Sequence, residues 1–376
     1  MTVIAASRIF DGQRFLTGHA VVIEGDRIAA ILPEGGAGPV TRLDGTLAPA
    51  FLDLQVNGGG GLMVGGDTDL AALRHICATH QALGCAGVLP TLITDTPQAT
   101  AAVIAAGIEA ARAQVPGFLG LHLEGPHLDP LRHGAHDPAL IRPMTPEDLA
   151  RLCDAARALP VLMVTLAPES ATPDQIATLS CAGAIVSLGH TDCDYDTARA
   201  AFAAGARCVT HLFNAMSQMG HRTPGLVGAV LSGDTPAGLI ADAVHVHPAA
   251  MRAALAARPQ GIFLVTDCMA FAGTGLSQMD LQGRRILRRE GRLTLADGTL
   301  AGADLRMDRA IRVLVDQVGI APERALAMAS SEPARVAGLS DEYGALRAGR
   351  RADLVLLNDD WALQSAWIAG QPVTRG

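Results

Sequence analysis

The stretch AIVSLGHTDCDYDTARAAFAAGARCVTHLF (residues 184–213) contains the pattern from which the fold can be predicted. It begins and ends with the apolar runs AIVSLGH (184–190) and CVTHLF (208–213), which are typical of strands buried on both faces. Between them, DTARAAFAAG (196–205) has the apolar spacing of a helix. The stretch therefore predicts a strand, a helix and a second strand parallel to the first.

The same pattern recurs along most of the chain. Six further β-prone runs are TLAPAFLDLQV (46–56), AGVLPTLIT (86–94), FLGLHLE (118–124), VLMVTLA (161–167), AGLIADAV (237–244) and GIFLVTD (261–267). Helix-like stretches such as DLAALRHICATHQALG (69–84) and PEDLARLCDAARAL (146–159) lie in several of the intervals. Eight strand-then-helix units make up a (β/α)₈ barrel, so we predict an α/β fold with a TIM-type catalytic barrel over residues 49–337.

The two ends of the chain have a different, all-β texture. VIAASRIFDG (3–12) and AVVIEGDRIAAI (20–31) alternate with Gly and Asp turns, and YGALRAGRRADLVLLND (343–359) has the same character. We expect residues 1–48 and 338–376 to form one small β-sandwich domain. Within the barrel region, the basic run RRILRRE (284–290) predicts a charged hairpin.

Composition excludes several functional classes. A formal net charge of −8 argues against a nucleic-acid partner. Residues 1–15 show no secretion signal, and we find no uncharged apolar stretch of about 20 residues that would predict a membrane span. We therefore expect no membrane partner. The seven cysteines form no CxxC pair, which favours reduced thiols and a cytoplasmic location.

The chain contains no lysine, since all 29 basic side chains are arginine. Schiff-base chemistry and a phosphate-loop lysine are therefore excluded. Metal sites bridged by a carbamylated lysine are excluded for the same reason.

Four residues at separate strand ends suggest a metal site. Glu124, His190 and His211 each lie at or near the end of an apolar run, and such a set suits a divalent ion with one position left for water. Asp267 ends another run and is placed to take a proton from that water. Because the carboxyl ends of barrel strands share one rim, the pattern predicts metal-assisted hydrolysis there. Other polar residues expected at this rim are Gln55, Asn57, Thr91 and His245.

Specific motifs identify a family. In order, the chain reads FLDLQVNGGGG, LPTLIT, LHLEGPHLDP, GAHDP, LGHTD, THLFNAMSQMGHRTPGLVGA, ADAVHVHP, VTDCMAFAG and TLAGADLRMD. These segments resemble the N-acetylglucosamine-6-phosphate deacetylases of the amidohydrolase superfamily. The resemblance covers nearly the whole chain, and THLFNAM followed by HRTPG is its most specific part. It implies hydrolysis of the acetamide of N-acetyl-D-glucosamine 6-phosphate to D-glucosamine 6-phosphate and acetate, by metal-activated water with an aspartate as acid/base.

The resemblance also implies roles for individual residues. Glu124, His190 and His211 correspond to the metal ligands, Asp267 to the catalytic acid/base, and His136 to a histidine that contacts the substrate near its acetyl group. The expected substrate-binding residues are Ala135, Asn214, Ala215, Arg222, His245, Leu300, Ala301 and Gly302. In the family, the arginine matching Arg222 reaches the neighbouring subunit's site, so we expect a homodimer.

Two departures from related sequences affect these expectations. Many amidohydrolases carry HxH after the first barrel strand, whereas this chain has Gln55 and Asn57. Neutral amides are poor ligands for a transition metal, so we read them as a vestigial second-metal position. We expect one divalent ion per subunit, Zn²⁺ first and Fe²⁺, Mn²⁺ or Co²⁺ as alternatives. Secondly, Asp137 replaces a common Asn in GAHDP, and we expect it to point away from the site or to tune specificity.

Three alternatives remain open at this stage. The first is a deacetylase of another amino-sugar phosphate, such as N-acetylgalactosamine 6-phosphate. A cyclic-amide hydrolase is disfavoured because that class needs the HxH pair and a carbamylated lysine. A non-catalytic sugar-phosphate-binding relative would be marked by the loss of a ligand or of the acid/base, and here all four residues are present.

Overall fold

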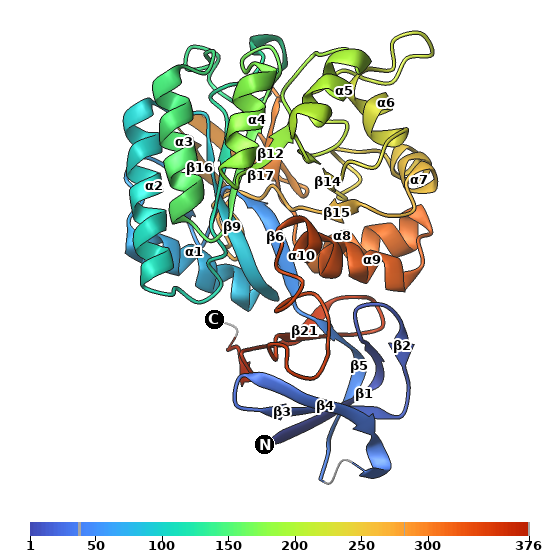
Figure 1. The fold of residues 1–376 in the computed structure, drawn as a ribbon. Coiled ribbons are helices and arrows are strands. Elements are labelled where there is room, and N and C mark those ends of the chain that lie inside the picture. Colours follow the sequence, from blue (N-terminus) through green and yellow to red (C-terminus); the bar gives the residue numbers. More distant parts are fainter. Residues whose placement is uncertain (37–38, 282, 375–376) are drawn as a thin grey trace.

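The computed structural model describes residues 1–36, 39–281 and 283–374, and its largest part is a barrel of parallel strands (Figure 1). The eight barrel strands pair in chain order. They are β6 (Phe51–Val56), β9 (Cys85–Ile93), β10 (Leu121–Glu124), β11 (Leu162–Leu166), β12 (Ile185–Leu188), β13 (Cys208–Val209), β14 (Ala237–Leu239) and β15 (Ile262–Leu264). The first and last strands meet just beyond β15, where the Asp267 amide donates to the Gln55 carbonyl at 3.0 Å. The predicted (β/α)₈ barrel is confirmed.

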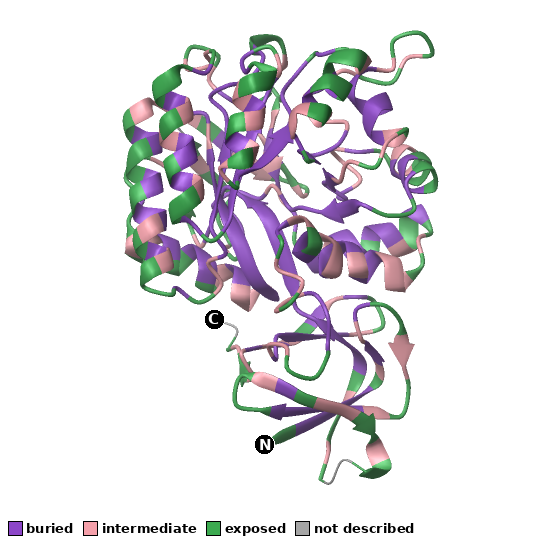
Figure 2. Cartoon of the chain, viewed as in Figure 1, coloured by how far each residue is buried: buried purple, intermediate pink, exposed green. Residues whose placement is uncertain are grey.

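Each barrel strand is followed by a helix. The helices are α1 (Leu70–Ala82), α2 (Pro97–Arg112), α3 (Pro146–Ala158), α4 (Pro173–Cys181), α5 (Tyr195–Ala204), α6 (Gly225–Leu231), α7 (Pro248–Ala257) and α8 (Met307–Val313). Thr-Pro pairs begin α2, α3 and α4, where the threonine hydroxyl accepts a backbone N–H and proline needs no partner for its nitrogen. Figure 2 shows that these helices are buried on the side that faces the barrel and exposed on the outer side.

The end of the barrel region is helical. A π-helical turn (Leu314–Val318) continues α8, and α9 (Pro322–Ala329) and α10 (Ser331–Val336) follow. Short 3₁₀ turns occupy Glu34–Gly36 and Pro130–Arg132. The second of these lies in the long loop after β10, which also carries His136.

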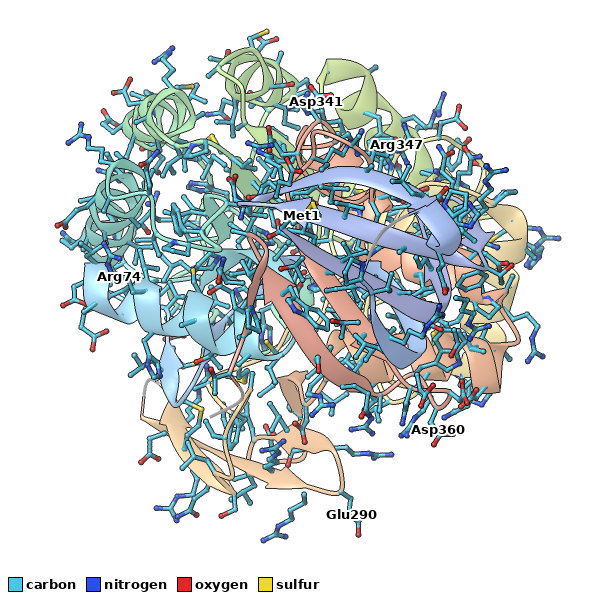
Figure 3. All side chains as sticks on the ribbon, turned by 90° about the horizontal axis from the view of Figure 1, so that it is seen from below. Met1, Arg74, Glu290, Asp341, Arg347 and Asp360 are labelled. Atoms are coloured by element: carbon cyan, nitrogen blue, oxygen red, sulfur yellow. The ribbon has the colours of Figure 1, made fainter. Side chains whose placement is uncertain are left out.

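A second sheet is built from both ends of the chain, as predicted. Its order is β22-β21-β20-β5-β1-β3-β4, with β2 also paired to β1. The strands are β1 (Thr2–Phe10), β2 (Phe15–Leu16), β3 (His19–Glu24), β4 (Arg27–Pro33), β5 (Thr41–Pro49), β20 (Leu354–Leu357), β21 (Leu363–Ile368) and β22 (Gln371–Pro372). Figure 3 views the molecule from this side, with Met1 on the sheet. The precise limits of the two domains stay a prediction.

Two smaller sheets lie beside the barrel. A hairpin of β7 (Gly58–Gly59) and β8 (Leu62–Met63) follows β6. Between β15 and α8, an antiparallel sheet consists of β16 (Gln278–Leu281), β17 (Arg284–Arg289), β18 (Arg292–Thr294) and β19 (Leu300–Ala303). The predicted charged hairpin is part of this sheet. Its last strand reaches the barrel rim, where the Ala303 amide donates to the Asp267 carbonyl at 2.9 Å.

Among the helices of the described residues, none combines the length and the apolar character that crossing a membrane requires.

Candidate metal centre and active site

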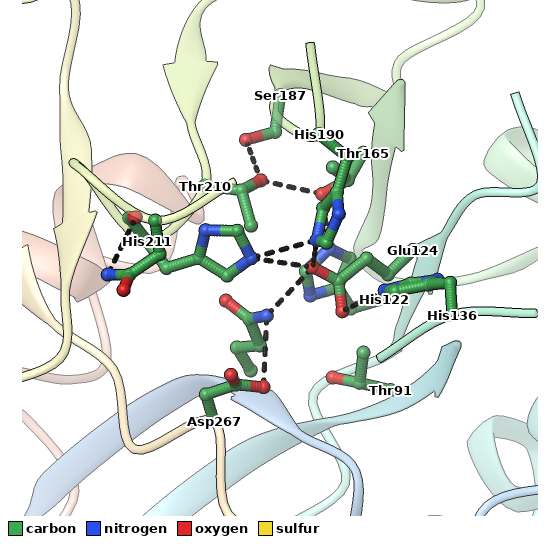
Figure 4. Close-up of polar contacts among 12 residues, drawn as sticks. Thr91, His122, Glu124, His136, Thr165, Ser187, His190, Thr210, His211 and Asp267 are labelled. Carbon is green, nitrogen blue, oxygen red and sulfur yellow. Dashed lines mark hydrogen bonds and ion pairs between the residues drawn. The ribbon is translucent and has the colours of Figure 1, made fainter. Parts of the chain in front are cut away.

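The three predicted metal ligands converge at the carboxyl end of the barrel (Figure 4). Glu124 is the last residue of β10, and His190 and His211 each come two residues after a strand, β12 and β13. Both imidazole Nε2 atoms lie beside Glu124 Oε1, at 3.2 Å for His190 and 3.1 Å for His211. All three side chains are buried. One ligand atom from each lies within 4.8 Å of the other two, close enough to hold a metal ion.

The hydrogen bonding of His190 favours a cation at this point. Its Nδ1 lies 2.8 Å from the backbone carbonyl of Arg132, which only accepts, so Nδ1 carries the proton. In the neutral ring Nε2 therefore presents a lone pair to the Glu124 carboxylate. Two acceptors at 3.2 Å repel unless a positive charge lies between them. A divalent ion held by Glu124, His190 and His211 satisfies this arrangement, and the Arg132 carbonyl orients one ligand, as outer partners do in metal sites.

Electrostatics keep the glutamate ionised. Burial alone favours its neutral form, but the positive charge that the His190 and His211 imidazoles can carry beside it outweighs burial and holds the pKa of Glu124 well below its usual range. The carboxylate is therefore ready to bind a cation at neutral pH.

The carboxylate of Asp267 is held by the two amides at the predicted vestigial metal position. Gln55 Nε2 donates to Asp267 Oδ1 at 3.2 Å and Asn57 Nδ2 donates to the same oxygen at 2.7 Å. Gln55 also donates to Glu124 Oε1 at 3.1 Å, so it links the acid/base candidate to the ligand set. Hydrogen bonds thus fill the position that the sequence predicted to be a vestigial second-metal site.

The pKa of Asp267 is raised to about 6, first by burial and then by the negative charge of Glu124. A carboxyl group with a pKa near the operating pH both accepts and returns a proton readily. Asp267 therefore has the electrostatic setting of a general acid/base.

His136 lies on the opposite side of Glu124. Its Nε2 is 3.8 Å from Glu124 Oε2, and its ring packs edge-on against that of His190 with centroids 4.4 Å apart. Burial and then the neighbouring His190 lower the pKa of His136 to about 3. The ring is thus neutral and faces the metal centre.

His245 is anchored by a carboxylate that the sequence did not single out. Its Nδ1 lies 2.6 Å from Asp242 Oδ2, and Asp242 Oδ1 accepts the backbone N–H groups of Val244 and His245 at 2.8 Å each. With Nδ1 engaged, the Nε2 edge of His245 is left to meet a ligand.

These groups surround an open cavity of about 770 Å³. It is lined by Asn57, Met63, Ile93, Glu124, Gly134, Ala135, His136, His190, His211, Asn214, Ala215, Ile240, His245, Asp267, Met269, Leu300, Ala301 and Gly302. The structure thus gathers the predicted ligands, the acid/base and seven of the eight predicted substrate-binding residues. Arg222 is the exception, since it is exposed and does not line the cavity of its own chain.

Some lining residues and supports were not predicted. Met63, Ile93, Ile240 and Met269 add an apolar wall, and nothing in the sequence distinguishes them from core residues. Thr91, expected at the rim, is instead a buried support whose Oγ1 accepts the Val56 N–H at 2.9 Å. Asp137 does not line the cavity, and its Oδ1 accepts the Ala139 N–H at 3.0 Å. This agrees with the expectation that Asp137 points away.

Backbone strain marks the same rim. His190, His211 and Asp267 have φ values of 49°, 25° and 50°, in the left-handed region that non-glycine residues seldom adopt. Such conformations cost about 1–3 kcal/mol each and persist where the surroundings over-determine them.

Residues 46–373 match the amidohydrolase family and residues 1–36 match the NagA composite domain. Over 331 residues, the chain is 40% identical to N-acetylgalactosamine-6-phosphate deacetylase of Shewanella sp. (strain ANA-3), covering 87% of this chain and 83% of that protein. It is 34% identical to N-acetylglucosamine-6-phosphate deacetylase of Haemophilus influenzae, covering 96% of this chain and 97% of that protein.

A solved structure shares the whole architecture. It is the N-acetyl-D-glucosamine-6-phosphate deacetylase of Mycobacterium smegmatis, as an aspartate-to-alanine variant in complex with N-acetyl-D-glucosamine-6-phosphate. The TM-score is 0.91 at 33% identity, with 99% of both chains covered.

Proposed function

Because the chain belongs to the amidohydrolase family, we propose that it removes the acetyl group from N-acetyl-D-glucosamine 6-phosphate, giving D-glucosamine 6-phosphate and acetate. One observation carries this proposal: Glu124, His190, His211 and Asp267 meet in one cavity at the carboxyl rim of the barrel. The chain is a hydrolase, and the named relatives act on the acetamide of an amino-sugar phosphate.

The protein residues supply most of what amide hydrolysis requires. Asp267 accepts a proton from the attacking water and then delivers it to the sugar nitrogen as the C–N bond breaks. His136 donates a hydrogen bond to the acetyl oxygen, where negative charge develops. Gln55 and Asn57 keep the Asp267 carboxylate in one orientation during both proton transfers.

Glu124, His190 and His211 would hold one divalent ion, which we propose is Zn²⁺, with Fe²⁺, Mn²⁺ or Co²⁺ as alternatives. When bound, such an ion acts as a Lewis acid and lowers the pKa of water to about 7.

The sugar would occupy the rest of the cavity. We assign its contacts to Ala135 and the Leu300–Gly302 segment, and the phosphate to Asn214, the Ala215 backbone and His245. No arginine is among the described residues that line this cavity. We therefore propose that Arg222 serves the neighbouring subunit of a homodimer, where its planar guanidinium binds phosphate.

The second candidate substrate is N-acetylgalactosamine 6-phosphate, favoured by the 40% identity to the Shewanella enzyme. The two sugars differ in the orientation of one hydroxyl, so a few loop contacts decide between them. We also propose a cytoplasmic location, which the cysteines support because all but the exposed Cys181 are buried and each is a free thiol.

The direct test is acetate release from N-acetylglucosamine 6-phosphate, from the unphosphorylated sugar and from the galacto epimer. Each is measured with and without a chelator, followed by restoration of Zn²⁺. Fast release that requires the phosphate and stops with the chelator is expected. The ratio between the two epimers identifies the preferred substrate. Release from none of the three by metal-replete protein would overturn the proposed function.

A further inference from the structure

We infer that Thr94, immediately after β9, is a positioning residue that fixes His136 as the tautomer with its proton on Nε2. The inference rests on the proposed function only for its consequence, because the tautomer itself is a property of the free protein. Thr94 is buried and does not line the cavity, so it acts through His136.

The first observation is a backbone hydrogen bond. The Thr94 N–H donates to His136 Nδ1 at 3.3 Å. A peptide nitrogen has no acceptor capacity, so Nδ1 must offer a lone pair. This excludes the tautomer with the proton on Nδ1, and it also excludes the doubly protonated ring.

The second observation is a shorter contact from the same residue. Thr94 Oγ1 lies 2.7 Å from His136 Nδ1. Because Nδ1 carries no proton, the hydroxyl is the donor. The Glu124 carbonyl oxygen is a second acceptor within reach of the same hydroxyl hydrogen, but at 3.4 Å it is the much longer contact. The shorter distance assigns the hydroxyl hydrogen to the ring.

The absence of a side chain at Gly125 leaves space for the Thr94 hydroxyl. Gly125 has a φ of 85°, and a Cβ at this position would lie only 2.2 Å from Thr94 Oγ1. The glycine of the EGP motif therefore lets the hydroxyl sit between the ligand-bearing strand end and the His136 ring. A larger residue would force Thr94 away from Nδ1.

The consequence concerns the other ring nitrogen. His136 Nε2 faces the metal centre, 3.8 Å from Glu124 Oε2. With its proton fixed there, Nε2 is a donor toward an acetyl oxygen that gains negative charge. The opposite tautomer would present a lone pair to both that oxygen and the Glu124 carboxylate, and both contacts would be repulsive.

The first experiment reads the tautomer directly. Protein with ¹⁵N-labelled histidine, loaded with Zn²⁺, is studied by long-range ¹H–¹⁵N correlation, and the His136 signals are assigned by their loss in His136→Gln. We expect an unprotonated, hydrogen-bonded Nδ1 and a protonated Nε2. A protonated Nδ1, or rapid averaging between the two tautomers, overturns the inference whether or not the protein releases acetate.

The second experiment isolates the hydroxyl. In Thr94→Val the Nδ1 signal should move toward that of a free ring nitrogen. The kcat for acetate release should fall about tenfold with KM and Zn²⁺ content unchanged, because the Nε2 contact is strongest in the transition state. Thr94→Ser, which keeps the hydroxyl, should restore most of kcat.

A matched control removes a threonine hydroxyl elsewhere. Thr100 donates to the Thr96 carbonyl within α2, and Thr100→Val should leave kcat and the His136 signals unchanged. Wild-type kcat in Thr94→Val would overturn the role of the hydroxyl. If the wild type releases no acetate but shows the expected tautomer, the proposed function fails and the assignment of Thr94 stands.

Discussion

Asp267 has two carboxylate oxygens with different surroundings. Oδ1 accepts hydrogen bonds from Gln55 and Asn57, whereas no hydrogen bond to Oδ2 is found among the described residues. An oxygen without a donor is the one that can receive a proton from water. The Gln55 and Asn57 amides therefore hold Oδ1 and leave Oδ2 to take the proton.

Replacing this carboxylate by an amide gives the sharpest test at the residue scale. Asp267→Asn should bind metal normally, because Glu124, His190 and His211 are unchanged. It should lower kcat by roughly 10²–10⁴-fold, since an amide accepts no proton. Metal analysis and calorimetric titration with the substrate check retention, and acetate release checks turnover. Turnover near that of the wild type would refute the proton-transfer role.

The orienting amide can be removed separately. Asn57 touches Asp267 but none of the three ligands, so Asn57→Ala should leave the Zn²⁺ content unchanged and lower kcat about tenfold, the loss expected for one hydrogen bond to a charged group. Asn358→Ala, in the loop between β20 and β21, is the matched control and should change neither quantity. Full activity in Asn57→Ala would mean that Gln55 alone orients the carboxylate.

At the scale of elements, the barrel is closed by a buried carboxyl group on β6. Asp53 is completely buried and accepts hydrogen bonds from Thr266, at 2.5 Å from its hydroxyl and 3.2 Å from its amide. These bonds tie the first strand to the segment that follows β15. Burial raises the pKa of Asp53 to about 7, although the Thr266 hydrogen bonds oppose the shift.

This pKa predicts a pH dependence of stability. Between about pH 4 and pH 7 the unfolded chain loses the Asp53 proton while the folded chain keeps it. Raising the pH through this window therefore lowers the free energy of unfolding, by roughly 4 kcal/mol in all. Asp53→Asn removes this dependence, so its Tm relative to the wild type should rise from pH 4 to pH 7 and then level off. Melts of both proteins at each pH provide the measurement.

The exposed Asp44 on β5 supplies a control for that experiment. Asp44→Asn should follow the wild-type Tm at every pH, because its carboxyl group is not held in the core. If the Asp53→Asn and wild-type curves ran parallel, the buried carboxyl would not be the source of the pH dependence.

The elements also show what the sequence could predict. Strand positions followed from apolar runs, and parallel strands necessarily bring Glu124, His190, His211 and Asp267 to one rim. The link between Thr94 and His136 could not be predicted, because it depends on how the loop after β10 folds back onto the end of β9. Local sequence carries no signal for such a long-range contact. The apolar wall residues were missed because burial in a core and burial beside a ligand select the same side chains.

At the scale of the whole molecule, the phosphate site raises the question of assembly. The cavity is lined by His245 and Asn214 but by no arginine among the described residues, and Arg222 is exposed outside it. A phosphate binds weakly where no permanently charged cation lies beside it. Since the chain contains no lysine, we propose that an arginine of a second subunit supplies the positive charge that the phosphate needs.

Mixed dimers separate the action of Arg222 on its own subunit from action on the partner. Arg222→Ala and Asp267→Asn chains carrying different tags are co-expressed, and the heterodimer is isolated through both tags. If Arg222 serves the partner, one site of the heterodimer combines an intact Asp267 with an intact Arg222, and the other site has neither. The heterodimer should then show about half the wild-type activity at substrate concentrations below KM. Each homodimeric variant should be far less active, since Arg222→Ala raises KM and Asp267→Asn lowers kcat.

If Arg222 serves its own subunit, both sites of the heterodimer are defective and no activity returns. Failure to isolate any doubly tagged species would show that the chain does not form the dimer that the proposal requires.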